Sequence, residues 1–203
     1  MTDENRPAPL ISDERSASLT LDASKLPRPY GRGRQAVALI VLALLGKLVM
    51  LLILGRPLNC DCGQIWAMPD QAGLNSQTVL DPYSLLHLVF GAVLAKLVFW
   101  KRPDWPLWTI MAAVVVSGTV WEMAENLPVT IDMFGYSSGD PLAYHGDSIV
   151  NSFSDTAAAV FGAALALPLA GWVVAAIAVA VELLLSLWVG DGYVIGLWRV
   201  LTS

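Results

Sequence analysis

Charged residues are scarce in this chain. Asp, Glu, Lys and Arg account for 14% of its 203 residues, whereas they make up about a quarter of a typical soluble domain. Hydrophobic residues reach 56%, so the composition excludes an ordinary soluble domain and indicates a membrane protein. The 12 basic residues are outnumbered by 17 acidic ones, and no basic stretch is interleaved with aromatic residues. Binding to nucleic acid is therefore not expected.

Cysteine is also rare, and the two cysteines present are too few for a disulfide framework. Cys60 and Cys62 are separated by one residue. Because a Cys-x-Cys disulfide is strained, pairing with a partner, capture of a soft metal and free loop thiols are the open alternatives for them. The sequence further lacks internal repeats, a phosphate-binding glycine loop and a Gly-x-Ser-x-Gly motif. Nucleotide binding and serine-hydrolase chemistry are thus not predicted.

Five segments are long and apolar enough to cross a bilayer as helices, which takes roughly 20 residues each. They are residues 36–54, 80–100, 107–127, 148–167 and 171–189. The sequence therefore predicts an all-α polytopic membrane protein, a bundle of about five transmembrane helices within residues 35–203. Residues 1–34 are polar and lack apolar periodicity, which predicts a disordered cytoplasmic tail.

The distribution of Lys and Arg predicts how the bundle is oriented. Basic residues cluster before the first predicted helix and reappear in the second connection, as Lys101 and Arg102. The loop at 55–79 has only Arg56, and the connection at 128–147 has neither Lys nor Arg. This alternation predicts a cytoplasmic N-terminus and a C-terminus on the outer side of the membrane.

Polar residues inside the predicted helices fall at similar depths. At 1.5 Å per helical residue, the residues of this polar layer lie within about 12 Å of the outer helix ends. They are Lys47, His87, Glu122, Glu125, Asn151, Asp155 and Glu182, with Asn126 and Asp147 at the helix ends. The inner half receives almost no polar residue beyond Lys96, which can snorkel to the cytoplasmic interface. Each Asp at the bilayer centre costs roughly 2.5–3.5 kcal/mol on insertion scales. A shared depth therefore indicates a polar pocket that faces inward and opens to the outside.

The chemistry of this set indicates a cation or a proton site. Neighbouring carboxylates in a low dielectric cannot all ionise, so some of them bind protons or a metal. His87, Glu122, Glu125 and Asp155 are the predicted ligands and catalytic acid and base groups; the metal they suit is divalent Mn, Fe, Mg, Ca or Zn. The predicted substrate-binding residues are Asp147, Asn151, Asn126, Lys47 and Glu182. Two alternatives stay open: the polar residues act as interhelical hydrogen-bond partners, and Lys47 snorkels outward instead of serving as a counter-ion.

Three motifs carry a resemblance to a known family. "GRPLNCDCG", "WEMAEN" and "GDSIVNSFSDT" occur in this order, with a histidine on the second predicted helix. With them, the chain resembles an uncharacterised family of bacterial inner-membrane proteins, a domain of unknown function, over about residues 36–200. The resemblance implies a protein of the bacterial inner membrane, so the outer side that the Lys and Arg distribution predicts for the C-terminus is the periplasm. It implies no activity.

A second, weaker likeness is to the VanZ-like membrane proteins, which are associated with glycopeptide resistance. The matching positions are His87, Glu122 with Glu125, Asp147 with Asn151, and Gly162. The chain departs from that pattern in its Glu125–Asn126 pair and in the additional Asp155. This resemblance implies a role in the cell envelope or toward lipid-linked compounds.

The function favoured by these features is metal- or proton-dependent chemistry on a lipid or lipid-linked envelope substrate, with the bilayer as the constant partner. An alternative is a non-catalytic accessory or assembly subunit of a larger membrane complex. A third is a proton-coupled carrier, although the polar layer does not extend to the inner face and no inverted repeat is present. The absence of a recognisable nucleophile counts against catalysis of the covalent type.

Overall fold

The computed structural model describes residues 26–27, 33–134 and 142–202. This part of the chain contains helices and loops and no named strand, so the predicted all-α class is confirmed. The helices are α1 (Gly33–Ile53), α2 (Ser84–Lys101), α3 (Leu107–Glu125), α4 (Pro128–Phe134), α5 (Ile149–Ala166), α6 (Gly171–Trp188) and α7 (Tyr193–Thr202). Most of the predicted tail at 1–34 lies outside the described residues, and its last two residues belong to α1.

Five of these helices are long and apolar enough to span a membrane, namely α1, α2, α3, α5 and α6. The chain is therefore a multi-pass membrane protein. The second span begins later than predicted because Asp81 forms a turn before it: one carboxylate oxygen of Asp81 accepts hydrogen bonds from the backbone amides of Tyr83 and Ser84. The short helices α4 and α7 were not predicted, since neither is long enough to cross the bilayer.

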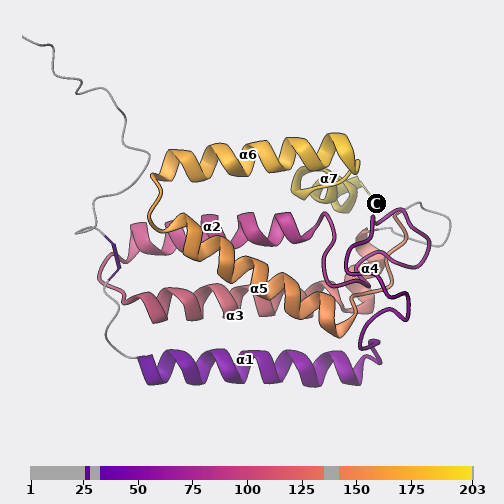
Figure 1. Cartoon of the computed structure of the whole chain (residues 1–203), viewed down its shortest axis with the longest axis horizontal. Coiled ribbons are helices and arrows are strands. Elements are labelled where there is room, and N and C mark those ends of the chain that lie inside the picture. Colours follow the sequence, from indigo (N-terminus) through magenta and orange to yellow (C-terminus); the bar gives the residue numbers. More distant parts are fainter. Residues whose placement is uncertain (1–25, 28–32, 135–141, 203) are drawn as a thin grey trace, which may run out of the picture.

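The long helices pack side by side, with α2 and α5 against each other at the centre (Figure 1). Helices α3 and α1 lie on one side of this pair and α6 on the other. Residues 54–83, α4, residues 142–148 and α7 gather at one end of the bundle, which we call the loop end. The connections from α2 to α3 and from α5 to α6 lie at the opposite end.

Helices α2 and α5 approach until their backbones touch. A methyl group built on Gly91 would lie 1.8 Å from the carbonyl oxygen of Ala159, and one on Gly162 would lie 2.0 Å from that of Leu88. Small residues at a helix crossing permit this kind of contact in membrane proteins. The crossing fixes the residues one turn away on each helix, which are His87 on α2 and Asp155 on α5.

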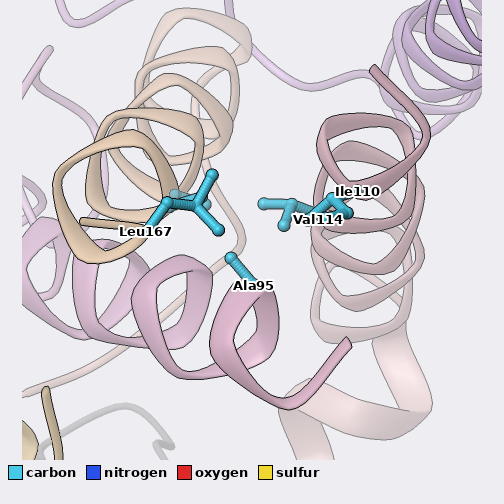
Figure 2. Close-up of a cluster of buried hydrophobic side chains, with 6 residues drawn as sticks. Ala95, Ile110, Val114 and Leu167 are labelled. Carbon is cyan, nitrogen blue, oxygen red and sulfur yellow. The ribbon is translucent and has the colours of Figure 1, made fainter. Parts of the chain in front are cut away.

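The opposite end of the bundle is closed by an apolar core. Ala95 of α2, Ile110 and Val114 of α3, and Leu167 at the end of α5 point toward one another there (Figure 2). All four side chains are buried. This core contains no polar side chain. Lys96 of α2 donates to the carbonyls of Leu167 and Leu169 at this end, whereas the acidic side chains of the described spans lie toward the loop end.

A candidate cation site beside an amphipathic cavity

His87 lies between two acidic side chains at the loop end. Its Nδ1 is 3.3 Å from Oε1 of Glu122 on α3, and its Nε2 is 3.7 Å from Oδ2 of Asp155 on α5. Three helices that are distant in sequence thus contribute to one cluster. One nitrogen and two carboxylate oxygens of these residues lie within 4.8 Å of one another, close enough to hold a metal ion together.

Glu122 is the most deeply placed of these groups. Its side chain is 0% exposed, and neither carboxylate oxygen has a hydrogen-bond partner within the described residues. Burying a carboxylate without hydrogen bonds or a counter-charge costs several kcal/mol by general estimates. A positive charge near Glu122 would therefore offset the cost of burying its carboxylate.

A second acidic group adjoins the first through Glu122. Oxygens of Glu122, Glu125 and Asp147 also lie within 4.8 Å of one another. Asp147 is held in place by Asn126, whose Nδ2 donates to Oδ2 over 2.5 Å and whose Oδ1 accepts from the Asp147 backbone amide. The hydroxyl of Tyr144 donates to the other oxygen of Asp147. Asp147 precedes α5, and burial raises its pKa above the ordinary value for aspartate.

Asp81 is a buried acid that sequence reasoning missed. It lies before α2 and is linked to the His87 cluster through Ser84, whose backbone amide donates to Asp81 and whose hydroxyl donates to Asp155 over 2.7 Å. The amide of Asn151 donates to Asp81 over 3.4 Å and to the carbonyl of Thr78. Burial, with a further contribution from Asp155, raises the pKa of Asp81 to about 8. Its signal in the sequence is the Asp-Pro-x-Ser turn that precedes an apolar helix.

Lys47 is completely buried where α1 meets α5. Its ammonium group donates to the carbonyl of Ser152 over 2.8 Å and to the hydroxyl of Thr156 over 2.6 Å, and it lies 4.5 Å from the centre of the Phe153 ring. These contacts point the side chain into the bundle, which contradicts the outward snorkelling alternative. Its two partners, Ser152 and Thr156, lie within one turn of Asp155 on α5. Lys47 therefore contributes a positive charge next to the acidic cluster.

Arg56 ties the segment that carries Asp147 to the rest of the loop end. Its guanidinium donates to the carbonyl of Asn126 over 2.6 Å and to the carbonyl of His145. The side chain of Gln77 adds a bond to the carbonyl of Gly146 over 2.6 Å. These bonds join the end of α1, the end of α3 and the start of α5 into one assembly.

Glu182 is the predicted site residue that the structure places apart from the others. Its two oxygens accept hydrogen bonds from the backbone amides of Tyr193 and Val194, at 3.1 and 2.8 Å. Glu182 thus binds the first turn of α7 and lies outside both acidic groups. His87, Asp155, Glu125 and Asp147, in contrast, each belong to an acidic group that includes Glu122.

A cavity of about 500 Å³ lies beside the cluster. His87, Glu125, Asp147 and Asp155 line its polar part. Its apolar wall includes Leu86 and Phe90 of α2, Trp121 of α3, Met133 of α4 and Leu197 of α7. A cavity lined both by several acids and by large apolar side chains suits a ligand that is itself amphipathic.

Cys60 and Cys62 form a disulfide with each other in the loop that follows α1. This corrects the expectation from the sequence, which set the internal disulfide aside as strained. The backbone amide of Cys60 donates to the carbonyl of Gln77. The disulfide thus belongs to the layer of loops that covers the cluster.

Together, these features define an all-helical, multi-pass membrane protein with a histidine and several acids gathered at one end of its bundle. The chain belongs to the family described as Protein of unknown function (DUF2585), whose model matches residues 51–201. The predicted membership in an uncharacterised bacterial family is thereby confirmed. The likeness to VanZ-like proteins stays a prediction.

The chain is also similar to several bacterial proteins that are named UPF0314. It is 37% identical over 153 residues to a UPF0314 protein of Sphingopyxis alaskensis, covering 74% of this chain and 80% of the relative. It is 36% identical over 157 residues to a UPF0314 protein of Brucella anthropi, covering 76% and 79%. It is 35% identical over 169 residues to UPF0314 protein R03235 of Rhizobium meliloti, covering 78% and 83%. No solved structure matches the chain.

Proposed function

We propose that this protein is a membrane enzyme that uses a divalent cation, held by Glu122 with His87 and Asp155, to act on a lipid or lipid-linked substrate. Imidazole nitrogen and carboxylate oxygen together suit Mn²⁺, Fe²⁺ and Zn²⁺, whereas an all-oxygen set suits Mg²⁺ and Ca²⁺. A cation bound there would polarise an oxygen of the substrate or activate a water molecule. Glu125 and Asp147 line the same cavity and are placed to accept or donate a proton.

The observation that carries this proposal is the burial of Glu122 without hydrogen bonds to its carboxylate oxygens within the described residues. Its carboxylate is fully buried and lacks hydrogen-bond donors within the described residues. It is also the member that the two acidic groups have in common. A cation bound there would offset the cost of burying the carboxylates, which a purely structural role for Glu122 leaves unexplained.

We further propose that the loop end faces the periplasm of a bacterial cell. The support is the distribution of Lys and Arg, because the connections at the opposite end carry Lys101 and Arg102. In that orientation the C-terminus is periplasmic. An alkaline phosphatase fused after Ser203 is expected to be active, and a green fluorescent protein at the same place to be dark; the reverse result would contradict this orientation.

A proton relay is the second candidate function. Its support is the position of the His87 ring, which has one nitrogen toward Glu122 and the other toward Asp155. A proton-coupled carrier is less well supported, because the apolar core around Ala95 and Leu167 closes the opposite end of the bundle. An accessory subunit would use the same polar contacts only to hold the helices together.

Metal analysis of the detergent-purified chain separates these functions. The protein is loaded with Mn²⁺, desalted and analysed for bound metal, alone and as Glu122→Gln, His87→Ala and Asp155→Asn. We expect stoichiometric manganese in the unmodified protein and its loss in Glu122→Gln. His87→Ala and Asp155→Asn are expected to weaken binding by about 10- to 100-fold or more, since each removes one ligand.

Glu182→Gln is the matched control, because it changes the same residue type at the same end of the bundle but outside both acidic groups. It is expected to retain manganese. Gel filtration confirms that each variant is folded. Folded protein that binds no metal would contradict the cation site and favour the proton relay. Metal-free protein that co-purifies with a larger complex and tolerates Glu122→Gln would favour the accessory subunit.

A further inference from the structure

We propose that the substrate is a membrane lipid with a phosphate headgroup, and that it enters the cavity sideways from the bilayer between α3, α4 and α7. This inference rests on the cation site proposed above and names the chemical class of its substrate. It has three supports: the continuity of the cavity wall with the lipid-facing surface, the exposed apolar face of α7, and the carboxylates that line the cavity.

The cavity wall is continuous with the outer surface of the bundle. Trp121 of α3 and Leu197 of α7 both line the cavity, yet 43% and 59% of these residues is exposed. Met133 of α4 also lines the cavity and is exposed. A residue that takes part in both surfaces marks an opening. Since Trp121 lies in a membrane-spanning helix, this opening faces lipid tails as well as water.

Helix α7 presents an apolar surface beside this opening. Val194, Leu197, Trp198 and Leu201 are all exposed on it. The helix has ten residues, too few to cross a bilayer, and lies at the loop end next to α6 (Figure 1). Its first turn is fixed to α6 by Glu182, and the hydroxyl of Tyr193 donates to the carbonyl of Leu86 on α2. An exposed apolar face at the end of a membrane bundle is the surface of an interfacial helix, with its apolar side in the lipid.

The acids that line the cavity favour a particular headgroup. They are Glu125, Asp147, Asp155 and Asp191, and His87 lies among them in the cavity wall. Carboxylates alone repel an anion, but a divalent cation held by carboxylates binds phosphate oxygens well, as in many phosphate-processing sites. A cavity of about 500 Å³ accommodates a headgroup and the first part of the acyl chains. The rest of each chain then stays in the bilayer.

Native mass spectrometry of the Mn²⁺-loaded full chain tests the inference with three probes. They are dioctanoyl phosphatidic acid, glycerol 3-phosphate, which lacks acyl chains, and dioctanoylglycerol, which lacks phosphate. We expect phosphatidic acid to bind at least about 10-fold more tightly than either of the others, a difference of about 1.4 kcal/mol. Removing manganese with a chelator is expected to abolish this preference.

Two substitutions on α7 locate the opening. Leu197→Asp places a negative charge at the cavity wall, whereas Leu201→Asp places it one turn away on a residue that does not line the cavity. Both residues are exposed, so both variants are expected to fold and to keep their manganese. Only Leu197→Asp is expected to weaken phosphatidic acid binding, by at least about 10-fold.

Each other result overturns the inference in a distinguishable way. If manganese binds but glycerol 3-phosphate competes as well as phosphatidic acid, the site takes a water-soluble phosphate and lateral entry is wrong. If dioctanoylglycerol binds equally well, the phosphate does not contact the cation. If Leu197→Asp and Leu201→Asp behave alike, the lipid does not pass α7. If no manganese binds at all, the cation site itself fails, and the phosphate preference fails with it.

Discussion

The two ends of the α2–α5 pair are packed in opposite ways. Toward the opposite end, Ala95 and Ala163 belong to one buried apolar cluster with Ile110 and Val114 of α3. Figure 2 shows Ala95, Ile110 and Val114 pointing toward one another. Toward the loop end, His87 and Asp155 of the same two helices form a polar contact of 3.7 Å, and the helices border a cavity. The difference indicates that close backbone packing in the middle of the pair holds the apolar half rigid. The polar half contains buried polar atoms without hydrogen-bond partners within the described residues. Its arrangement therefore depends on the close packing in the middle of the pair.

The glycines at the helix crossing provide the largest expected effect. Gly91→Ala puts a methyl group 1.8 Å from the carbonyl oxygen of Ala159, where only the backbone can yield. We expect a loss of about 1–3 kcal/mol or more in the free energy of unfolding, and loss of metal binding because His87 moves away from Asp155. Thermal unfolding in detergent measures the first effect, and metal analysis measures the second.

Gly46→Ala on α1 is the control for this change. No atom lies within 4 Å of a methyl group built there, so the substitution is expected to be neutral or stabilising by up to about 1 kcal/mol. If Gly91→Ala is as stable as Gly46→Ala and keeps its metal, the crossing does not support the polar end. The arrangement of the polar end would then be independent of the packing at the crossing.

Asp81 provides an intermediate effect, which appears as a dependence of stability on pH. Its pKa is raised from the ordinary 3.8 to about 8, so the folded protein binds a proton here that the unfolded chain releases. Stability should therefore fall as the pH rises from about 4 to about 8, with a slope of up to about 1.4 kcal/mol per pH unit. Asp81→Asn is expected to reduce this slope in the metal-free protein, as measured by urea or thermal unfolding at several pH values.

Asp70→Asn is the control for the loss of one carboxylate, because Asp70 lies exposed in the same loop. An unchanged slope in Asp81→Asn would mean that Asp81 is already ionised in the folded state. In that case the polar end is better hydrated than its burial indicates, and the contrast between the two ends is smaller.

Glu182 provides the smallest expected effect. Glu182→Ala removes two charge-assisted hydrogen bonds to the first turn of α7, at Tyr193 and Val194. We expect a cost of about 1 kcal/mol, confined to opening of α7. Hydrogen exchange of the α7 amides measures it, with Ser186→Ala, one turn further along α6, as the control. Faster exchange throughout α2 and α5 would show that α7 stabilises the whole bundle instead.

Much of the fold was predictable because hydrophobic runs of this length have few alternatives. The start of α1 was predicted within three residues, and those of α3 and α6 coincide with the prediction. The late start of α2 was not predicted, because hydropathy does not detect the turn formed by Asp81 and Ser84. Helices α4 and α7 were missed since short helices are stabilised by their contacts more than by their own sequence.

The candidate site was predictable only as a set of residues at one depth. Depth placed Glu182 together with His87 and Glu122, but rotation about the helix axis directs Glu182 toward α7 instead. Asp81 lies at the start of the span predicted at 80–100 and was not recognised as part of the polar layer, whereas Tyr144 lies in a loop, where helical rise assigns no depth. The direction of Lys47 depended on its neighbours Ser152 and Thr156. None of these contacts can be derived from the spacing along one helix.

The sequence by itself determined that this chain is an all-helical membrane protein and that its polar groups share one end of the bundle. Both follow from hydrophobic length and from the fixed rise of a helix, which are local properties. Tertiary structure alone decided which acids meet His87, that no hydrogen bond within the described part of the chain satisfies the oxygens of Glu122, and that a cavity lies beside α7. Those outcomes depend on how α2, α3 and α5 are rotated against one another, and the close contact at Gly91 and Gly162 sets that rotation for the central pair.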